Sequence, residues 1–175
     1  MLRSWFKRLR GRTPLRPPGA LFPDILFEQA CIRCRRCVEI CPYDSIQTAH
    51  GDRGLEMGLP YIEPREIPCY LCMKCPPVCP TGALQLVTDQ RQVKMGLAVI
   101  DRDRCLAYNG VICRACYERC PIYREAIVLK DELYPVVMAD KCVGCGICEN
   151  VCPADPAAIT VVSYSDLNDS RKRAK

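Results

Sequence analysis

The chain has 175 residues and a formal net charge of +5, and 16 of its residues are cysteine. Its 49% hydrophobic content disfavours a disordered or fibrous protein, and the lack of any run of 18 apolar residues argues against a membrane span in this sequence. Because only 3 Phe and 1 Trp are available for a core, we expect something besides side-chain packing to hold the fold together.

Residues 1–20 are predicted to form a basic arm, because they contain no acidic residue. Their apolar side chains recur at helical spacing, which suits an amphipathic segment on an anionic membrane or an acidic partner; a solvated terminus is the alternative. No apolar stretch follows, so a secretory signal is not predicted. The basic residues are Arg3, Lys7, Arg8, Arg10, Arg12 and Arg16, and the apolar ones are Leu2, Trp5, Phe6 and Leu9.

A second basic segment, residues 166–175, ends the chain. The two basic segments flank an acidic body and lack interleaved aromatic side chains along a groove, so we do not expect nucleic-acid binding.

Four groups of four cysteines account for every cysteine in the chain. Three groups have the spacing C-x2-C-x2-C-x3-C, and in all four groups proline follows the last cysteine. The groups are Cys31, Cys34, Cys37 and Cys41; Cys69, Cys72, Cys75 and Cys79; Cys105, Cys113, Cys116 and Cys120; and Cys142, Cys145, Cys148 and Cys152. This internal repetition organises the chain.

Short strands are predicted on either side of the groups, with brief helical turns after the cysteine-proline pairs. The residues before the groups are 61–63, 97–101 and 135–138, and those after them are 83–87, 126–129 and 159–162.

The cysteine spacing points to iron–sulfur chemistry. Three cysteines two residues apart can present three thiolates to one cube, and in bacterial ferredoxins the fourth cysteine of the run ligates the other cluster of a pair. Eight disulfides between such close partners would be badly strained. Zinc is the better rival, but its structural sites usually take two C-x2-C pairs with a dozen or more residues between them. Four runs therefore predict four [4Fe-4S] clusters.

Five further strings resemble signatures of the four-cluster ferredoxin-type subunits that accompany periplasmic nitrate reductase, and of the related methylamine dehydrogenase accessory ferredoxin. They are residues 16–21, 64–69, 79–84, 95–101 and 142–146, and the resemblance covers roughly residues 15–162. It implies an electron-transfer subunit that works between a quinol-oxidising membrane partner and a terminal oxidoreductase.

The sequence departs from this family in two places. Family members usually begin with a twin-arginine export signal, whereas this chain has only the basic start, and its second group is shorter than the family's. The third group has a long first gap, as in the family, and Asn109-Gly110 supplies a turn that lets Cys105 reach the cluster. The alternative for Cys105 is a free buried thiol.

Each cluster needs four cysteines, so the groups are expected to exchange their last members. Sequential pairing joins the first group to the second and the third to the fourth; nested pairing, first with fourth and second with third, is the alternative. The sequential sets are Cys31, Cys34, Cys37 and Cys79; Cys69, Cys72, Cys75 and Cys41; Cys105, Cys113, Cys116 and Cys152; and Cys142, Cys145, Cys148 and Cys120. The amides of Gly144, Gly146 and the residues between the cysteines are the expected donors to sulfur.

We therefore predict an α+β protein made of two bacterial-ferredoxin-like units, residues 21–92 and 93–165, between the basic ends. Its predicted function is electron relay through four [4Fe-4S] clusters between a membrane quinol-linked partner and a redox enzyme. An assembly, maturation or redox-sensing factor is the alternative, and a zinc-bound interaction module is a further one. The single histidine, His50, supports no catalytic constellation, and no nucleotide motif occurs. No substrate site is expected.

The predicted location is at a membrane, with peripheral contact through the basic arm. The cytoplasmic face is expected because no export signal is found, and co-export with a partner to the periplasmic face is the alternative.

Overall fold

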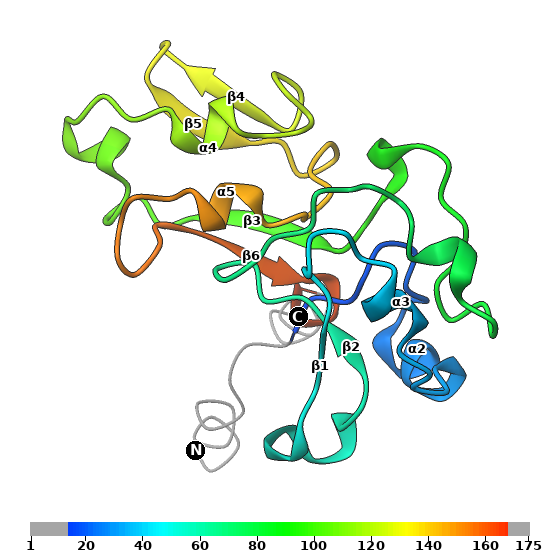
Figure 1. Ribbon diagram of the computed structural model, residues 1–175. Helices are drawn as coiled ribbons and strands as arrows, with labels where there is room; N and C mark the ends of the chain where they lie inside the picture. Colours follow the sequence, from blue (N-terminus) through cyan, green and yellow to red (C-terminus); the bar gives the residue numbers. More distant parts are fainter. Residues whose placement is uncertain (1–13, 168–175) are drawn as a thin grey trace, which may run out of the picture.

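The computed structural model describes residues 14–167, apart from the side chains of Asp52 and Arg53. Its helices and strands are short (Figure 1). The helices are α2 (Asp24–Ala30), α3 (Arg36–Glu39), α4 (Ala115–Glu118) and α5 (Ile147–Asn150), and the 3-10 turns are η1 (Gly51–Glu56), η2 (Pro76–Val78), η3 (Gln90–Gln92) and η4 (Leu106–Asn109). The strands are β1 (Gln47–Thr48), β2 (Pro60–Tyr61), β3 (Gly96–Ile100), β4 (Ile127–Lys130), β5 (Tyr134–Val137) and β6 (Ile159–Ser163). The predicted mixture of helix and strand is confirmed.

The strands form three separate antiparallel pairs, β1 with β2, β3 with β6, and β4 with β5. The pair β3–β6 is the longest, and Ala98 faces Val161 at its buried centre. Four predicted strands coincide with β3, β4, β5 and β6, and the prediction at 61–63 overlaps β2 by one residue. None of the described strands exceeds five residues, so backbone pairing alone stabilises this fold weakly.

The strand predicted for residues 83–87 is wrong, because only one isolated bridge, between Ala20 and Leu84, forms there. Leu86 is 73% exposed, so the apolar run lacks a buried face that would extend the pairing. Strand β1 was not predicted, since its polar Gln47 and Thr48 give no strand signal.

The helical turns lie before the last cysteine of each group and not after the cysteine-proline pair, so that prediction is wrong as well. The third and fourth cysteines of each group are four residues apart, and one turn (α3, η2, α4 or α5) fills the gap between them. Proline disfavours helical backbone in the residue before it, so the turn ends at the last cysteine. Cys79 shows this, with φ −76° and ψ 111°.

The predicted basic arm is shorter than residues 1–20. Leu15 is fully buried and pairs with Ile62, and Arg16 is only 5% exposed. The Arg16 guanidinium lies 3.2 Å from Glu28 and 3.7 Å from Glu56, which explains how its charge is buried. Residues 1–13 and 168–175, which carry the rest of the two predicted basic segments, lie outside the described residues.

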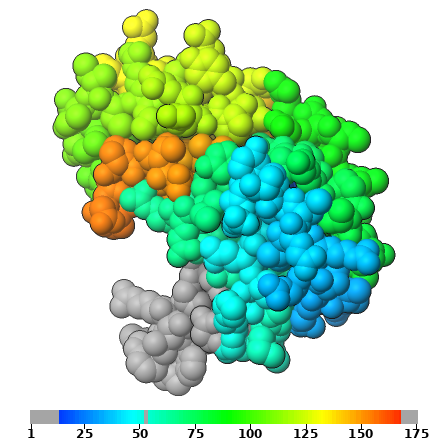
Figure 2. Space-filling view, viewed as in Figure 1, coloured from blue at the N-terminus to red at the C-terminus, as the bar shows by residue number. Residues whose placement is uncertain are grey.

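The two halves of the chain share one continuous core, in which buried side chains from Leu15 to Val161 touch. Figure 2 shows the orange segment around residue 150 against the green-cyan segment before residue 75. A backbone bond joins them, because Cys69 N–H donates to the Cys145 carbonyl at 2.9 Å. Within the second half, Met95 N–H donates to the Val143 carbonyl at 3.0 Å. No described helix combines the length and the apolar character that crossing a membrane requires.

Candidate functional site

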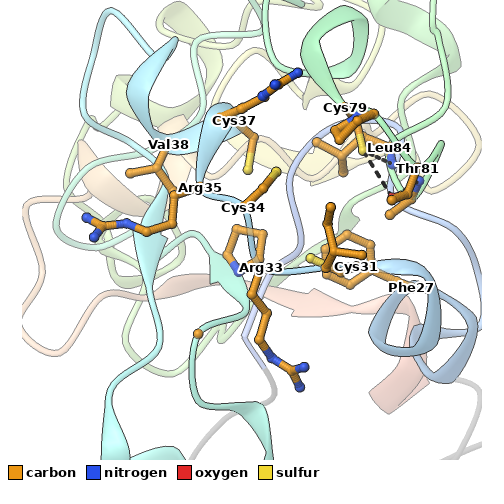
Figure 3. Close-up of a pocket in the computed structure, with 16 residues that line it drawn as sticks. Phe27, Cys31, Arg33, Cys34, Arg35, Cys37, Val38, Cys79, Thr81 and Leu84 are labelled. Carbon is orange, nitrogen blue, oxygen red and sulfur yellow. Dashed lines mark hydrogen bonds between the residues drawn. The ribbon is translucent and has the colours of Figure 1, made fainter.

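The sixteen cysteines are all free thiols, so the structure contains no disulfide framework. Four of them, Cys31, Cys34, Cys37 and Cys79, line one cavity with about 410 Å³ of empty space, including its open mouth. Figure 3 shows Cys31 beside α2, Cys34 and Cys37 on the loop into α3, and Cys79 facing them from the second group. The first three cysteines of one group thus meet the last cysteine of the next.

Two further sets surround cavities of the same kind. Cys41, Cys69, Cys72 and Cys75 line one of about 310 Å³, and Cys105, Cys113, Cys116 and Cys152 line one of about 370 Å³. Cys105, the least regular by spacing, therefore lies with its predicted partners.

The fourth set is the most buried. Cys142, Cys145 and Cys148 are all buried, and the thiols of Cys120 and Cys142 lie close enough to Cys145 to raise its pKa. Cys120 and Cys142 are the neighbours that sequential pairing of the groups predicts for Cys145.

The loops that carry the first cysteines share an unusual backbone. The residues on either side of the second cysteine have φ between 54° and 88° in three groups, the left-handed region that curls the chain around a concave side. Non-glycine residues adopt it at a cost of about 1 kcal/mol or more each, so tertiary structure must hold these loops. The residues are Arg33 and Arg35, Leu71 and Met73, and Gly144 and Gly146. The third group, with its long first gap, departs from the pattern.

Backbone amides donate hydrogen bonds to several of the sulfur atoms. Leu71 N–H lies 3.4 Å from Cys69 Sγ, Leu84 N–H 3.4 Å from Cys79 Sγ, and Ala158 N–H 3.3 Å from Cys152 Sγ. Leu71 lies between two cysteines, as expected, but the other two donors follow the groups and were missed. The prediction that the amides of Gly144 and Gly146 donate to sulfur stays a prediction. Such bonds tune the potential of a bound cluster.

The pKa values of the thiols follow burial and hydrogen bonding. Burial raises the pKa of Cys37 to about 11, and that of Cys69, Cys116 and Cys145 to about 12. At Cys79 burial also raises the pKa, but hydrogen bonds from Leu84 and Thr81 outweigh it, so the pKa lies below its ordinary value. Thiolates in such surroundings need a positively charged metal centre to stabilise them.

The four sets follow one another in a row. Burial raises the pKa of Cys75, and the thiol of Cys37 in the first set adds to this effect, so the first and second sets are neighbours. Burial likewise raises the pKa of Cys145, and the nearby thiol of Cys69 in the second set raises it further. Burial also raises the pKa of Cys148. Nearby thiols add to this effect, and one of them is Cys116 of the third set. The packing of α3 against η2, the backbone bond from Cys69 to Cys145 and the packing of α4 against α5 give the same neighbours, so the order in space is first, second, fourth, third.

The donor sets fit an iron–sulfur cluster. In the part of the chain that the structure describes, no three His, Cys, Asp or Glu side chains converge closely enough for a single metal ion. The thiols are spread around cavities whose other walls are largely apolar, such as Phe27, Val38 and Leu84 in the first. Four thiols around an enclosed apolar space suit a compact multi-iron group with cysteine ligands.

Arg65, just before the second cysteine group, forms hydrogen bonds with the fourth group. Its guanidinium donates to the carbonyls of Glu149 and Cys152, each at 2.9 Å, and of Ala154 at 3.2 Å, at the end of α5. The side-chain amide of Asn150 donates back to the Arg65 carbonyl at 3.1 Å. No motif signalled this arginine, because its partners are backbone atoms more than eighty residues away.

Replacing Arg65 by Ala should lower the free energy of unfolding by about 2–3 kcal/mol, because several carbonyls lose a charged donor at once. Arg65→Lys should recover only part of this, since an ammonium cannot bridge the same carbonyls as a planar fork. Denaturant unfolding of the loaded protein measures both, with Arg119→Ala, an exposed arginine, as the control. Equal stability of Arg65→Ala and the control would contradict the assigned role.

Comparisons with known proteins agree with these sites. Models of a 4Fe-4S dicluster domain match residues 98–161 and 30–83. The chain is 42% identical over 165 residues to the ferredoxin-type protein NapG of Escherichia coli (strain K12), covering 86% of this chain and 71% of the relative. It is also 42% identical over 159 residues to the methylamine utilization ferredoxin-type protein MauM of Methylorubrum extorquens, covering 85% and 72%, and 45% identical over 161 residues to MauM of Methylobacillus flagellatus, covering 86% and 68%.

Proposed function

This chain belongs to the family of ferredoxin-type proteins that includes NapG and MauM, and we propose that its sixteen cysteines hold four 4Fe-4S clusters in the sequential sets. It is an iron–sulfur electron-transfer subunit, with two dicluster domains, and not an enzyme by itself. Each bound cluster takes up and releases one electron with little rearrangement. The protein's own residues hold the clusters apart from water, donate hydrogen bonds to sulfur and fix their spacing.

The observation that carries the proposal is the row of the four cysteine sets. Helix α3, which carries Cys37, packs against η2 beside Cys75, Cys69 N–H donates to the Cys145 carbonyl at 2.9 Å, and α4, which carries Cys116, packs against α5, which carries Cys148. A series in the order first, second, fourth, third supports a relay whose ends are the first and third clusters. The second and fourth sets, which lie inside the row, include most of the buried thiols. This favours electron exchange with partner proteins at the first and third clusters.

Cys105 offers a test of the cluster assignment. Because it lines a cavity with Cys113, Cys116 and Cys152, we expect Cys105→Ser to lose about a quarter of the iron and sulfide, one cluster of four. Anaerobic purification followed by iron and sulfide analysis measures this, and Tyr108→Phe on the same loop is the control. Full iron content in Cys105→Ser would show that Cys105 is a free thiol.

The partners follow from the family resemblance and the relay. We infer that a membrane quinol-linked protein donates electrons at one end and a redox enzyme or cytochrome accepts them at the other. The loaded protein mixed with membranes that carry such a donor should be reduced when menadiol is added. Clusters that remain oxidised in that mixture, although dithionite reduces them, would favour the assembly or sensing role instead.

We further propose peripheral attachment to the membrane through the basic segment of residues 1–13, on the cytoplasmic face or, by co-export, on the periplasmic face. Removing residues 1–13 leaves Leu15 and Arg16 in the core, so the protein should stay folded yet move from the membrane fraction to the supernatant. Fractionation of cells expressing the full and shortened chains, with immunodetection, measures this. Unchanged membrane association would count against the role.

A further inference from the structure

The first cysteine set combines a terminal place in the row with the most open surface. Cys34 is the one exposed cysteine among the sixteen. Cys34 lines the first cavity, and the neighbouring Ile32 is 63% exposed. On the proposed function, this is a point where an electron can pass to or from another protein.

Three arginines of this cavity are named here the arginine rim: Arg33, Arg35 and Arg36. All are exposed and line the cavity, and no acidic residue occurs between Cys31 and Val38. The corresponding stretch of the fourth group, from Cys142 to Cys148, carries no charged residue. The second and third loops carry one basic residue each, Lys74 and Arg114, so the positive charge is densest at this end of the row.

The rim arginines face outward and not toward the sulfur atoms. Figure 3 shows the side chains of Arg33 and Arg35 extending away from the thiols of Cys34 and Cys37. Arg33 is held by the carbonyl of Met57, 3.0 Å from Nε. The guanidinium groups of Arg35 and Arg36 have no hydrogen bond or ion pair with any other described residue. Arginines that only stabilised the charge of a bound cluster would point toward the sulfur atoms. The outward direction of these side chains therefore favours contact with another molecule.

The backbone places two of these arginines on either side of the exposed cysteine, as it places Leu71 and Met73 in the second group. Arg33 and Arg35 have φ of 57° and 64°, a conformation that glycine adopts more easily and that the fourth group meets with Gly144 and Gly146. The first group keeps long charged side chains at these two positions in spite of the strain. That choice presents two guanidinium groups on opposite sides of the exposed cysteine.

We propose that the arginine rim is the docking surface for an acidic redox protein that exchanges one electron with the first cluster. In the outward direction, the cluster is oxidised by one electron and the partner's metal centre is reduced by one, with no proton or bond transferred. The inference deepens the proposed relay and rests on it. It assigns to this end a partner recognised by charge, through contacts that salt weakens.

The test uses the double variant Arg35→Gln/Arg36→Gln in the loaded protein, with Arg119→Gln/Lys130→Gln as the control of equal charge change in the other half. Two one-electron acceptor proteins of opposite charge, acidic plastocyanin and basic cytochrome c, serve as probes. The clusters are first reduced with dithionite, which is then removed. Stopped-flow absorbance gives the oxidation rate at several salt concentrations. Binding of copper(I) plastocyanin, which accepts no electron, to the oxidised protein is measured by calorimetry.

For plastocyanin at low salt we expect the rim variant to react about tenfold more slowly and to bind about tenfold more weakly, with a flatter dependence on salt. The control variant should change much less, and cytochrome c should not be slowed by the rim substitutions. Equal losses in both variants, or equal losses with both acceptors, would overturn the docking surface. Absence of reducible clusters in the unmodified protein would instead overturn the proposed function, so the two failures are distinguishable.

Discussion

Removing the iron–sulfur clusters from the folded protein will unfold it. Seven cysteines belong to the buried core, and the described helices α3, α4 and α5 have only four residues each. Helices this short and isolated strand pairs are not stable alone. Structural metal sites contribute about 10–16 kcal/mol to folding, whereas a whole domain is stable by only about 5–15 kcal/mol. Loss of the clusters therefore exceeds the total stability.

Hydrogen exchange followed by mass spectrometry, with and without oxidative removal of iron, measures this effect. Protection in β3 and β6 should fall to that of an unfolded chain, and the cooperative thermal transition should vanish. A chelator added without oxidant, which leaves the clusters in place, is the control. Retained protection in the iron-free chain would mean that side-chain packing holds the fold by itself.

Gly144→Ala should strongly destabilise the protein. Gly144 has φ of 72°, and a Cβ atom there would overlap the backbone of Gly96 at the start of β3. Backbone cannot move aside as a flexible side chain can, so overpacking and the left-handed strain add together. We expect a loss of about 3–4 kcal/mol in the free energy of unfolding and weaker retention of the fourth cluster.

Gly110→Ala provides the matched control. Gly110 has φ of 82°, but no other atom lies within 4 Å of a Cβ built there. Only the conformational strain of about 1 kcal/mol then remains. Denaturant unfolding of both loaded variants separates the close approach from the strain. Similar losses in the two variants would contradict the close contact between Gly144 and β3.

The sequence predicted those features that local spacing determines. The C-x2-C-x2-C-x3-C runs have one natural way to share ligands between neighbouring groups, and the sets that line the three cavities are the expected ones. Their role as cluster ligands stays a prediction. Strands β3 and β6 were predictable because alternating apolar residues there meet a buried face.

Other features depend on contacts between distant parts of the chain. Arg16 looked like one more charge in a basic arm, but carboxylates on α2 and η1 draw it into the core. Arg65 gained its role from carbonyls at the end of α5, which no pattern near residue 65 signals. The strand predicted at 83–87 is wrong for the same reason. Leu86 is exposed, so no distant segment packs on this stretch and pairs with it.

The most direct test of the account is the iron and acid-labile sulfide content of the anaerobically purified protein, with electron paramagnetic resonance after dithionite reduction. Four clusters predict about 16 iron and about 16 sulfide atoms per chain, with spectra broadened by coupling between neighbouring clusters. About four zinc atoms per chain with no paramagnetic signal, or about half the iron, would contradict four clusters held in a row.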